Sequence, residues 1–176
     1  VDYSGKNKEQ LLAIFETLLR TKPVQTIRAD VEAIKIAFYK NYRNEVDQLR
    51  KLFVESGGNS EDFVPPANEA EQQFKTLFAE YREKRNEFIA RLDAEKEANY
   101  QTKLQIIEEL KELVNSNETL NQTFNTFREL QQRWKETGLV QQSVMKDLWE
   151  TYNLHVENFY NFIKINKELR DLDLKK

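Results

Sequence analysis

The sequence predicts an all-α protein made of two tandem three-helix units with long, coiled-coil-like helices. Three observations support this fold class. Apolar residues recur at helical spacing along most of the chain. Only 4 glycines and 3 prolines interrupt 176 residues, so the chain has few places to turn. The apolar pattern also repeats within the chain, as in stacked helical units. We therefore expect helix in about 80% of residues or more and no β-sheet.

The clearest helical pair surrounds Gly138. We expect this glycine to end a helix with a positive φ. The apolar residues before it are Phe124, Phe127, Leu130 and Trp134, and those after it, at coiled-coil spacing, are Met145, Trp149, Tyr152, Val156, Phe159 and Ile163. Helices joined by a short loop lie antiparallel, so we expect Trp134, Trp149, Tyr152 and Phe159 in the core. A ligand-stacking role for either tryptophan is the alternative.

The first half of the chain carries its own helix signals. Asn7 can cap a first helix, with Gln10 at the capping-box position. Pro23 suits the first position of a second helix, which then runs for about 33 residues to Gly57 and Gly58. A third helix begins near residues 66–68, and we expect Phe63 and Val64 before it to pack towards the core. Residues 115–117, Asn-Ser-Asn, mark the next turn.

An internal repeat divides the chain into residues 1–98 and 99–176. Val31, Ile34 and Phe38 match Phe127, Leu130 and Trp134 at an offset of 96. The segment Leu77-Phe78-x-x-Tyr81 matches Leu148-Trp149-x-x-Tyr152 at an offset of 71, because the first unit has a longer hairpin. Superposed units should therefore place Phe38 on Trp134 and Phe78 on Trp149. No glycine or proline occurs between Pro66 and Gly138, so we expect the third helix to run through residues 98–102 into the second unit. A kink or break is the alternative, because the apolar pattern changes phase there.

Composition narrows the classes of function. The net charge is −3, which argues against a dedicated nucleic-acid-binding protein. The chain has no cysteine and hence no disulfide or thiolate metal site, which suits the cytoplasm. No apolar run is long enough to cross a membrane, and no signal peptide is recognisable. We expect a cytoplasmic location, and, because the sequence begins at Val1, a piece of a longer protein.

The residues that usually carry enzyme chemistry are scarce. The single histidine, His155, lies at the flank of the last apolar seam, which favours a boundary position over a ligand or a catalytic base. No Glu-x-x-His pair, histidine cluster or phosphate-binding glycine loop occurs. We therefore predict no enzymatic activity and no cofactor, while carboxylate-based or lysine-based catalysis stays open.

Basic residues recur every seven or eight positions on the second helix. They are Arg28, Lys35, Arg43 and Arg50, and they would line one side of it. Such a stripe can bind RNA, DNA, the ribosome or an acidic partner. A solvated face is the simpler interpretation, because Asp30, Glu32, Glu45 and Asp47 lie nearby. We take the four basic residues and His155 as the candidate partner-binding residues.

Three segments, LQQRWKETGLV, KDLWETYNLHVENFYNFI and NKELRDLDLKK, resemble the bacterial domain-of-unknown-function family 349. The shared features are a Trp-Lys pair before a glycine turn and a Leu-Trp-x-x-Tyr segment after it. The resemblance is strongest over Phe124 to Ile163, and it implies a bacterial, cytoplasmic, helical protein whose domains occur singly or in tandem. It implies no activity. We expect a non-enzymatic interaction or scaffold module with a protein partner, the alternative being an RNA-, DNA- or ribosome-associated module.

Overall fold

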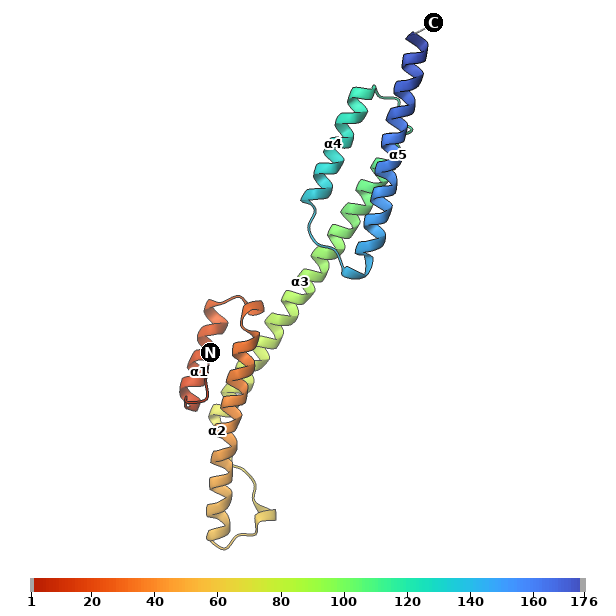
Figure 1. The fold of residues 1–176 in the computed structure, drawn as a ribbon. Helices are drawn as coiled ribbons and strands as arrows, with labels where there is room; N and C mark the ends of the chain where they lie inside the picture. The colour runs from red at the N-terminus through yellow and green to blue at the C-terminus, as the bar shows by residue number, and fades with distance from the viewer. Residues whose placement is uncertain (1, 175–176) are drawn as a thin grey trace. The chain divides into compact units, whose positions relative to one another are not determined.

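The computed structural model describes residues 2–174, with side chains described up to residue 169. The described residues form five α-helices (Figure 1), and 82% of the chain is helical with no strand among the described residues. The helices are α1 (Lys8–Thr21), α2 (Arg28–Glu55), α3 (Glu69–Leu113), α4 (Leu120–Glu136) and α5 (Gln142–Leu174). Two short 3₁₀ turns cover Val24–Thr26 and Ser60–Asp62. The prediction of an all-α fold is confirmed.

The chain divides into two compact units, Val1–Ala90 and Arg91–Lys176, called unit 1 and unit 2 below. Helix α3 contributes its first half to unit 1 and its second half to unit 2. It runs without a break for 45 residues, so the predicted continuation through residues 98–102 is confirmed. The reason is local, because alanine, glutamate and lysine dominate residues 94–98 and neither glycine nor proline follows before Leu113.

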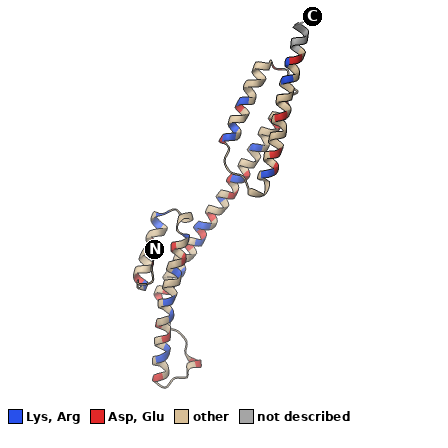
Figure 2. Cartoon of the chain, in the orientation of Figure 1, with Lys and Arg blue, Asp and Glu red and all other residues tan. Residues whose placement is uncertain are grey.

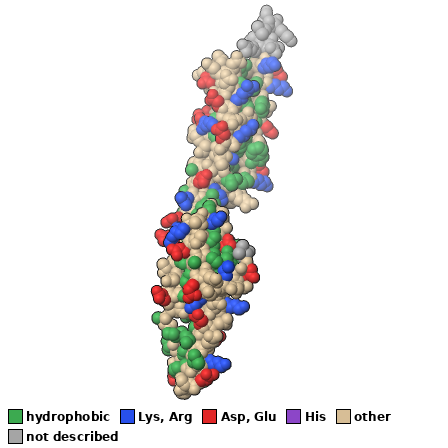
Figure 3. All heavy atoms as spheres, turned by 90° about the vertical axis from the view of Figure 1, so that its left-hand side faces the viewer, with side chains coloured by type: hydrophobic (Ala, Val, Ile, Leu, Met, Phe, Trp, Pro, Cys, Tyr) green, Lys and Arg blue, Asp and Glu red, His purple; other side chains and the backbone are tan. Residues whose placement is uncertain are grey.

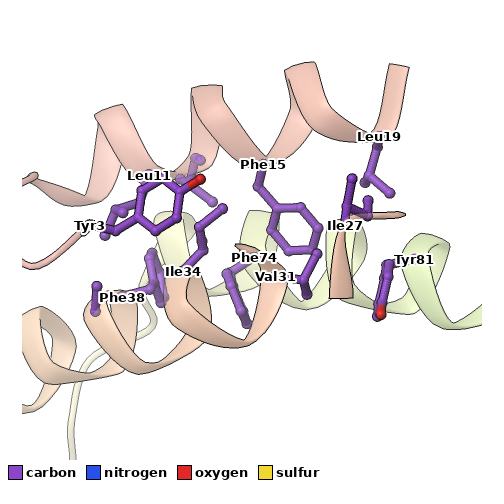
Figure 4. Close-up of a cluster of buried hydrophobic side chains, with 12 residues drawn as sticks. Tyr3, Leu11, Phe15, Leu19, Ile27, Val31, Ile34, Phe38, Phe74 and Tyr81 are labelled. Atoms are coloured by element: carbon purple, nitrogen blue, oxygen red, sulfur yellow. The ribbon is translucent and has the colours of Figure 1, made fainter. Parts of the chain in front are cut away.

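The core of unit 1 lies between α1, α2 and the first half of α3. Phe15 points from α1 towards side chains of the other two helices (Figure 4). Phe38 of α2 stacks on Phe74 of α3, with ring centroids 4.7 Å apart and planes 11° from parallel. The predicted cap of α1 is confirmed, because Asn7 accepts from the Gln10 amide and the Gln10 side chain accepts in return.

Helix α2 begins later than the sequence predicts. Pro23 is extended, with φ −61° and ψ 137°, and the 3₁₀ turn follows it. The Pro23 carbonyl accepts from both the amide (3.0 Å) and the hydroxyl (2.7 Å) of Thr26, which closes a tight turn instead of an α-helix. This turn places Ile27 in the core, where the residue is 1% exposed. The placement of Pro23 as the first residue of α2 is therefore wrong, and α2 has 28 residues.

Only part of the hairpin between α2 and α3 packs against neighbouring side chains. Gly57, at φ +101°, ends α2 as expected, and the next glycine lies against the ring of Phe53. Phe63 packs on the same ring, with centroids 5.6 Å apart. Val64, in contrast, is 79% exposed, so its predicted packing towards the core is wrong. Two prolines follow Val64, and the chain has no regular secondary structure from there to the start of α3.

The core of unit 2 lies between the second half of α3, α4 and α5. Trp134 of α4 stacks on Tyr152 of α5 with centroids 3.9 Å apart, and Phe127 stacks on Phe159 at 4.2 Å. All four rings are buried, as predicted for Trp134, Tyr152 and Phe159. Thr119 caps α4 through a capping box with Gln122.

Gly138 has a different role from the predicted one. Helix α4 already ends at Glu136, and Gly57 is the only glycine with a positive φ among the described residues. A Cβ added at Gly138 would lie 3.0 Å from Asn99 Nδ2, whose amide donates to the Leu139 carbonyl at 2.8 Å. A side chain of α3 thus approaches Gly138 closely, and a larger residue there would push against the Asn99 amide.

The predicted burial of Trp149 is wrong. Trp149 is 53% exposed and Met145 45%, whereas Leu148 is 5% exposed. A strict seven-residue seam drifts by about 20° per heptad around a straight α-helix, so Met145, two heptads before Phe159, lies about 40° round the helix from it. Trp149, ten residues before Phe159, lies about 80° round the helix from it. Leu148 therefore takes the core position, and its neighbour Trp149 lies about 100° further round the helix.

In the third helix of each unit, the match between the two units differs from the predicted match by one heptad. The predicted offset of 96 matches Phe38 with Trp134, and each of these rings stacks on one ring of the third helix. Those rings are Phe74 and Tyr152, so the offset there is 78 (152 minus 74) and not 71. The same offset pairs Tyr81 with Phe159, both buried. By this register the predicted equivalence of Phe78 and Trp149 is wrong.

Candidate interaction surfaces

The predicted basic stripe of α2 is partly neutralised by neighbours on the same helix. Arg28 Nε lies 3.3 Å from a Glu32 carboxylate oxygen, and Arg50 Nη1 lies 3.6 Å from one of Asp47. The Arg50 guanidinium also lies 5.4 Å from the ring centre of Phe63. Figure 2 shows the mixture of basic and acidic residues along the helices. Arg43 is exposed, and the eight-residue step from Lys35 to Arg43 turns the stripe by about 80°.

Lys35 takes part in a surface that the sequence did not reveal. Its Nζ lies 4.7 Å from the ring centre of Phe78 on α3. Between the two helices lies a cavity of about 190 Å³, called the α2/α3 cleft below. Its wall includes Lys35, Tyr39, Lys75, Phe78 and Arg82. Positions 75, 78 and 82 lie on one face of α3, which was the available signal, but their meeting with α2 depends on tertiary packing.

The aromatic rings along this side of α2 stay uncharged near neutral pH. Burial is the main cause that raises the pKa of Tyr39, and the Glu71 carboxylate adds to it. A hydrogen bond to Glu71 is the main cause that raises the pKa of Tyr42. Glu71 also pairs with Lys75, whose Nζ lies 3.3 Å from its carboxylate. The cleft therefore joins neutral rings with cations, one of which already has an acidic partner.

A second surface lies on α5 in unit 2. Met145, Trp149, half-buried Val156 and Tyr160 share one side of the helix at spacings of four, seven and four, and we call them the α5 stripe. Tyr160 is 50% exposed, and its ring stands edge-on to Phe127 with centroids 5.3 Å apart. The ring centroid of Trp149 lies 6.0 Å from that of Tyr152, so the indole borders the buried stack. The stripe is anchored to the core but open to solvent.

His155 is half-buried on α5, between Leu148 and Phe162 along the helix. It belongs to unit 2, whereas the four basic candidates belong to unit 1. Over the part of the chain that the structure describes, no three histidine, aspartate or glutamate side chains are close enough to hold a metal ion. None of the helices in this part of the chain has an apolar stretch sufficient to span a bilayer.

Two further surface features belong to unit 1. A groove of about 660 Å³ between α1 and α3 is lined by Glu9, Glu16 and Glu69, with Glu80 paired to Arg20. Beyond the bundle, the last turns of α2 and the following loop expose apolar side chains, which gather at the lower end of the view in Figure 3. The exposed residues are Leu49, Leu52, Val54 and Val64.

Fold and surfaces together define an all-α protein of packed amphipathic helices with aromatic cores. Residues 69–143 match the model of the family called Domain of Unknown Function (DUF349), so this part of the chain is similar to that family. The match covers α3, α4 and the turn into α5, so it confirms the resemblance over Phe124 to Ser143 and ends before the rest of the segment. The chain matches no curated protein and no solved structure.

Proposed function

We propose that this protein is a non-enzymatic helical interaction module, and that the α5 stripe of unit 2 binds a partner protein. The observation that carries the proposal is the 53% exposure of Trp149 beside a fully packed aromatic core. Tryptophan, tyrosine and methionine are the residues that protein interfaces favour, and a central tryptophan often carries much of the binding energy. The proposal includes a cytoplasmic location, which the resemblance to the family supports.

The geometry of the stripe suits a partner that lies along α5. Met145, Trp149 and Tyr160 extend over 15 residues, or about 22 Å of helix at 1.5 Å per residue. A helix or an extended segment of a partner would cover all three side chains. The alternative, a nucleic-acid surface along the whole of α2, is weakened at both ends of the basic stripe, because Arg28 and Arg50 already have acidic neighbours.

The test is retention of a partner by the full chain with the stripe intact or disrupted. Wild-type protein, Trp149→Ala and Ile36→Ala would be immobilised and exposed to nuclease-treated extract of the source cells. Ile36 is 69% exposed on α2 of unit 1 and serves as the matched apolar control. We expect a protein that wild type and Ile36→Ala retain and Trp149→Ala loses. Equal retention by all three variants, each with unchanged circular dichroism, would contradict the role of the stripe.

A further inference from the structure

The α2/α3 cleft of unit 1 combines aromatic rings with basic side chains. Its wall carries the rings of Tyr39 and Phe78, and three cations border it, Lys35, Lys75 and Arg82. We propose that this cleft binds single-stranded nucleic acid, with one base against the rings and the adjoining phosphates at Lys35 and Arg82. The proposal goes beyond the protein-binding function, because it uses another surface and another class of partner.

The cleft is small, which suits a single planar group against its rings. Its volume of about 190 Å³ is below the roughly 300–1,000 Å³ of pockets that hold drug-sized ligands. The rings form a continuous wall, since Phe78 stacks on Phe74 at 6.0 Å and Tyr39 stands edge-on to Phe74 at 5.3 Å. The Lys35 ammonium now covers Phe78. A base that enters replaces this ammonium on the ring, and the flexible stem of Lys35 lets the charge move to a phosphate.

The local charge favours a polyanion although the whole chain is acidic. Glu71 pairs with Lys75 and neutralises one of the three cations. Among the described residues, no carboxylate lies within ion-pair distance of Lys35 or Arg82. These two cations come from different helices and border the same cleft, so they can contact phosphates on either side of one base. Such contacts weaken as salt rises.

The aromatic rings of the cleft favour single-stranded nucleic acid over an acidic protein as the partner. A base in a single strand offers a free π-face to an aromatic side chain, whereas a duplex keeps its faces stacked. A carboxylate of an acidic peptide would use the cations and leave the rings uncovered. Tyr39 and Phe78 are both half-buried and both line the cleft, so an exposed base would cover apolar surface that an acidic peptide would not.

The experiment measures fluorescence anisotropy of labelled oligouridylate and oligothymidylate of about twelve nucleotides with the full chain. The test variant is Lys35→Ala with Arg82→Ala. The matched control is Lys40→Ala with Lys51→Ala, which removes the same charge from exposed positions about 140° or more round α2 from Lys35. We expect the test variant to weaken binding by about tenfold and the control by less than about twofold. Two lost phosphate contacts should lower the salt slope by about 1.4.

A second set of binding measurements distinguishes the contribution of base stacking from the contribution of charge. Tyr39→Leu keeps an apolar side chain but removes the ring, and it should weaken binding of the base-bearing strand by about fivefold or more. An abasic strand of equal length should bind more weakly than oligouridylate and should not respond to Tyr39→Leu. The proposal is overturned if the two double variants bind alike, if the abasic strand binds as well as oligouridylate, or if polyglutamate displaces the strand at equal charge concentration. Circular dichroism verifies that each variant is folded.

Discussion

Trp134 of α4 and Tyr152 of α5 stack with ring centroids 3.9 Å apart and planes 9° from parallel. Lys103 of α3 lies over the same tryptophan, its Nζ 4.4 Å from the ring centre. The three helical segments of unit 2 therefore meet at one indole ring. Trp149, at the other tryptophan position of the chain, stands beside this stack and faces solvent.

The two tryptophans should differ in their effect on stability. Trp134 is 7% exposed, so Trp134→Ala should lower the free energy of unfolding by about 3–5 kcal/mol, as in other large-to-small core changes. Trp149→Ala should lower it by less than about 1 kcal/mol, because the side chain is largely exposed. Urea unfolding followed by circular dichroism measures both. A loss above about 2 kcal/mol for Trp149→Ala would place that ring in the core.

Acrylamide quenching checks the same contrast without a large change in packing. Trp149→Phe leaves Trp134 as the only emitter, and its emission should be weakly quenched because Tyr152 and the core cover the indole. Trp134→Phe leaves Trp149, and its emission should be strongly quenched at the same acrylamide concentration. Similar quenching constants for the two variants would contradict the described burial.

Ionisation of Tyr152 should lower the stability of the folded protein at alkaline pH. Burial is the main cause that raises the pKa of Tyr152 above its usual value near 10, and Tyr160 adds to it. The neutral phenol is thus favoured in the folded state, so its contribution is complete below pH 10 and is lost as pH rises through the raised pKa. Burial lowers the pKa of Lys103 below its usual value near 10.5, so this lysine makes stability rise as the pH increases towards that value, which is the opposite sign.

Tyr152→Phe isolates the contribution of the phenol, because it keeps the stack with Trp134 and removes the ionisable group. The midpoint of urea unfolding should fall less steeply above pH 10 for Tyr152→Phe than for wild type. Parallel pH profiles would show that Tyr152 ionises equally in the folded and unfolded states.

Gly138→Ala should lower the stability of unit 2 by about 1 kcal/mol, the typical value of one hydrogen bond. The added Cβ would lie 3.0 Å from Asn99 Nδ2 and displace the amide that donates to the Leu139 carbonyl. Gly5→Ala is the control, because a Cβ there meets no atom within 4 Å. Both variants can be compared by urea unfolding, and an equal change in the two would argue against the close approach at Gly138.

Local sequence signals determined the secondary structure. Helical spacing predicted the helices, Asn7 predicted the start of α1, and residues 115–117 predicted the turn between α3 and α4. The unbroken course of α3 also followed from composition, because a helix needs only compatible residues and no distant contact. Pro23 is the exception, since a proline suits an α-helix and a 3₁₀ turn equally well until Ile27 is drawn into the core.

Tertiary structure alone decided the register of the helices and the composition of the candidate surfaces. Phe74 and Tyr81 are seven residues apart, and so are Tyr152 and Phe159, so a shift of one heptad leaves the apolar pattern unchanged. Stacking on Phe38 and Trp134 removes this ambiguity. Lys35 was predicted as a binding residue, but Phe78 and Arg82 join it only because α3 packs against α2. A periodic pattern shows which residues share a face of one helix, whereas the residues opposite that face depend on how far the second helix slides along the first.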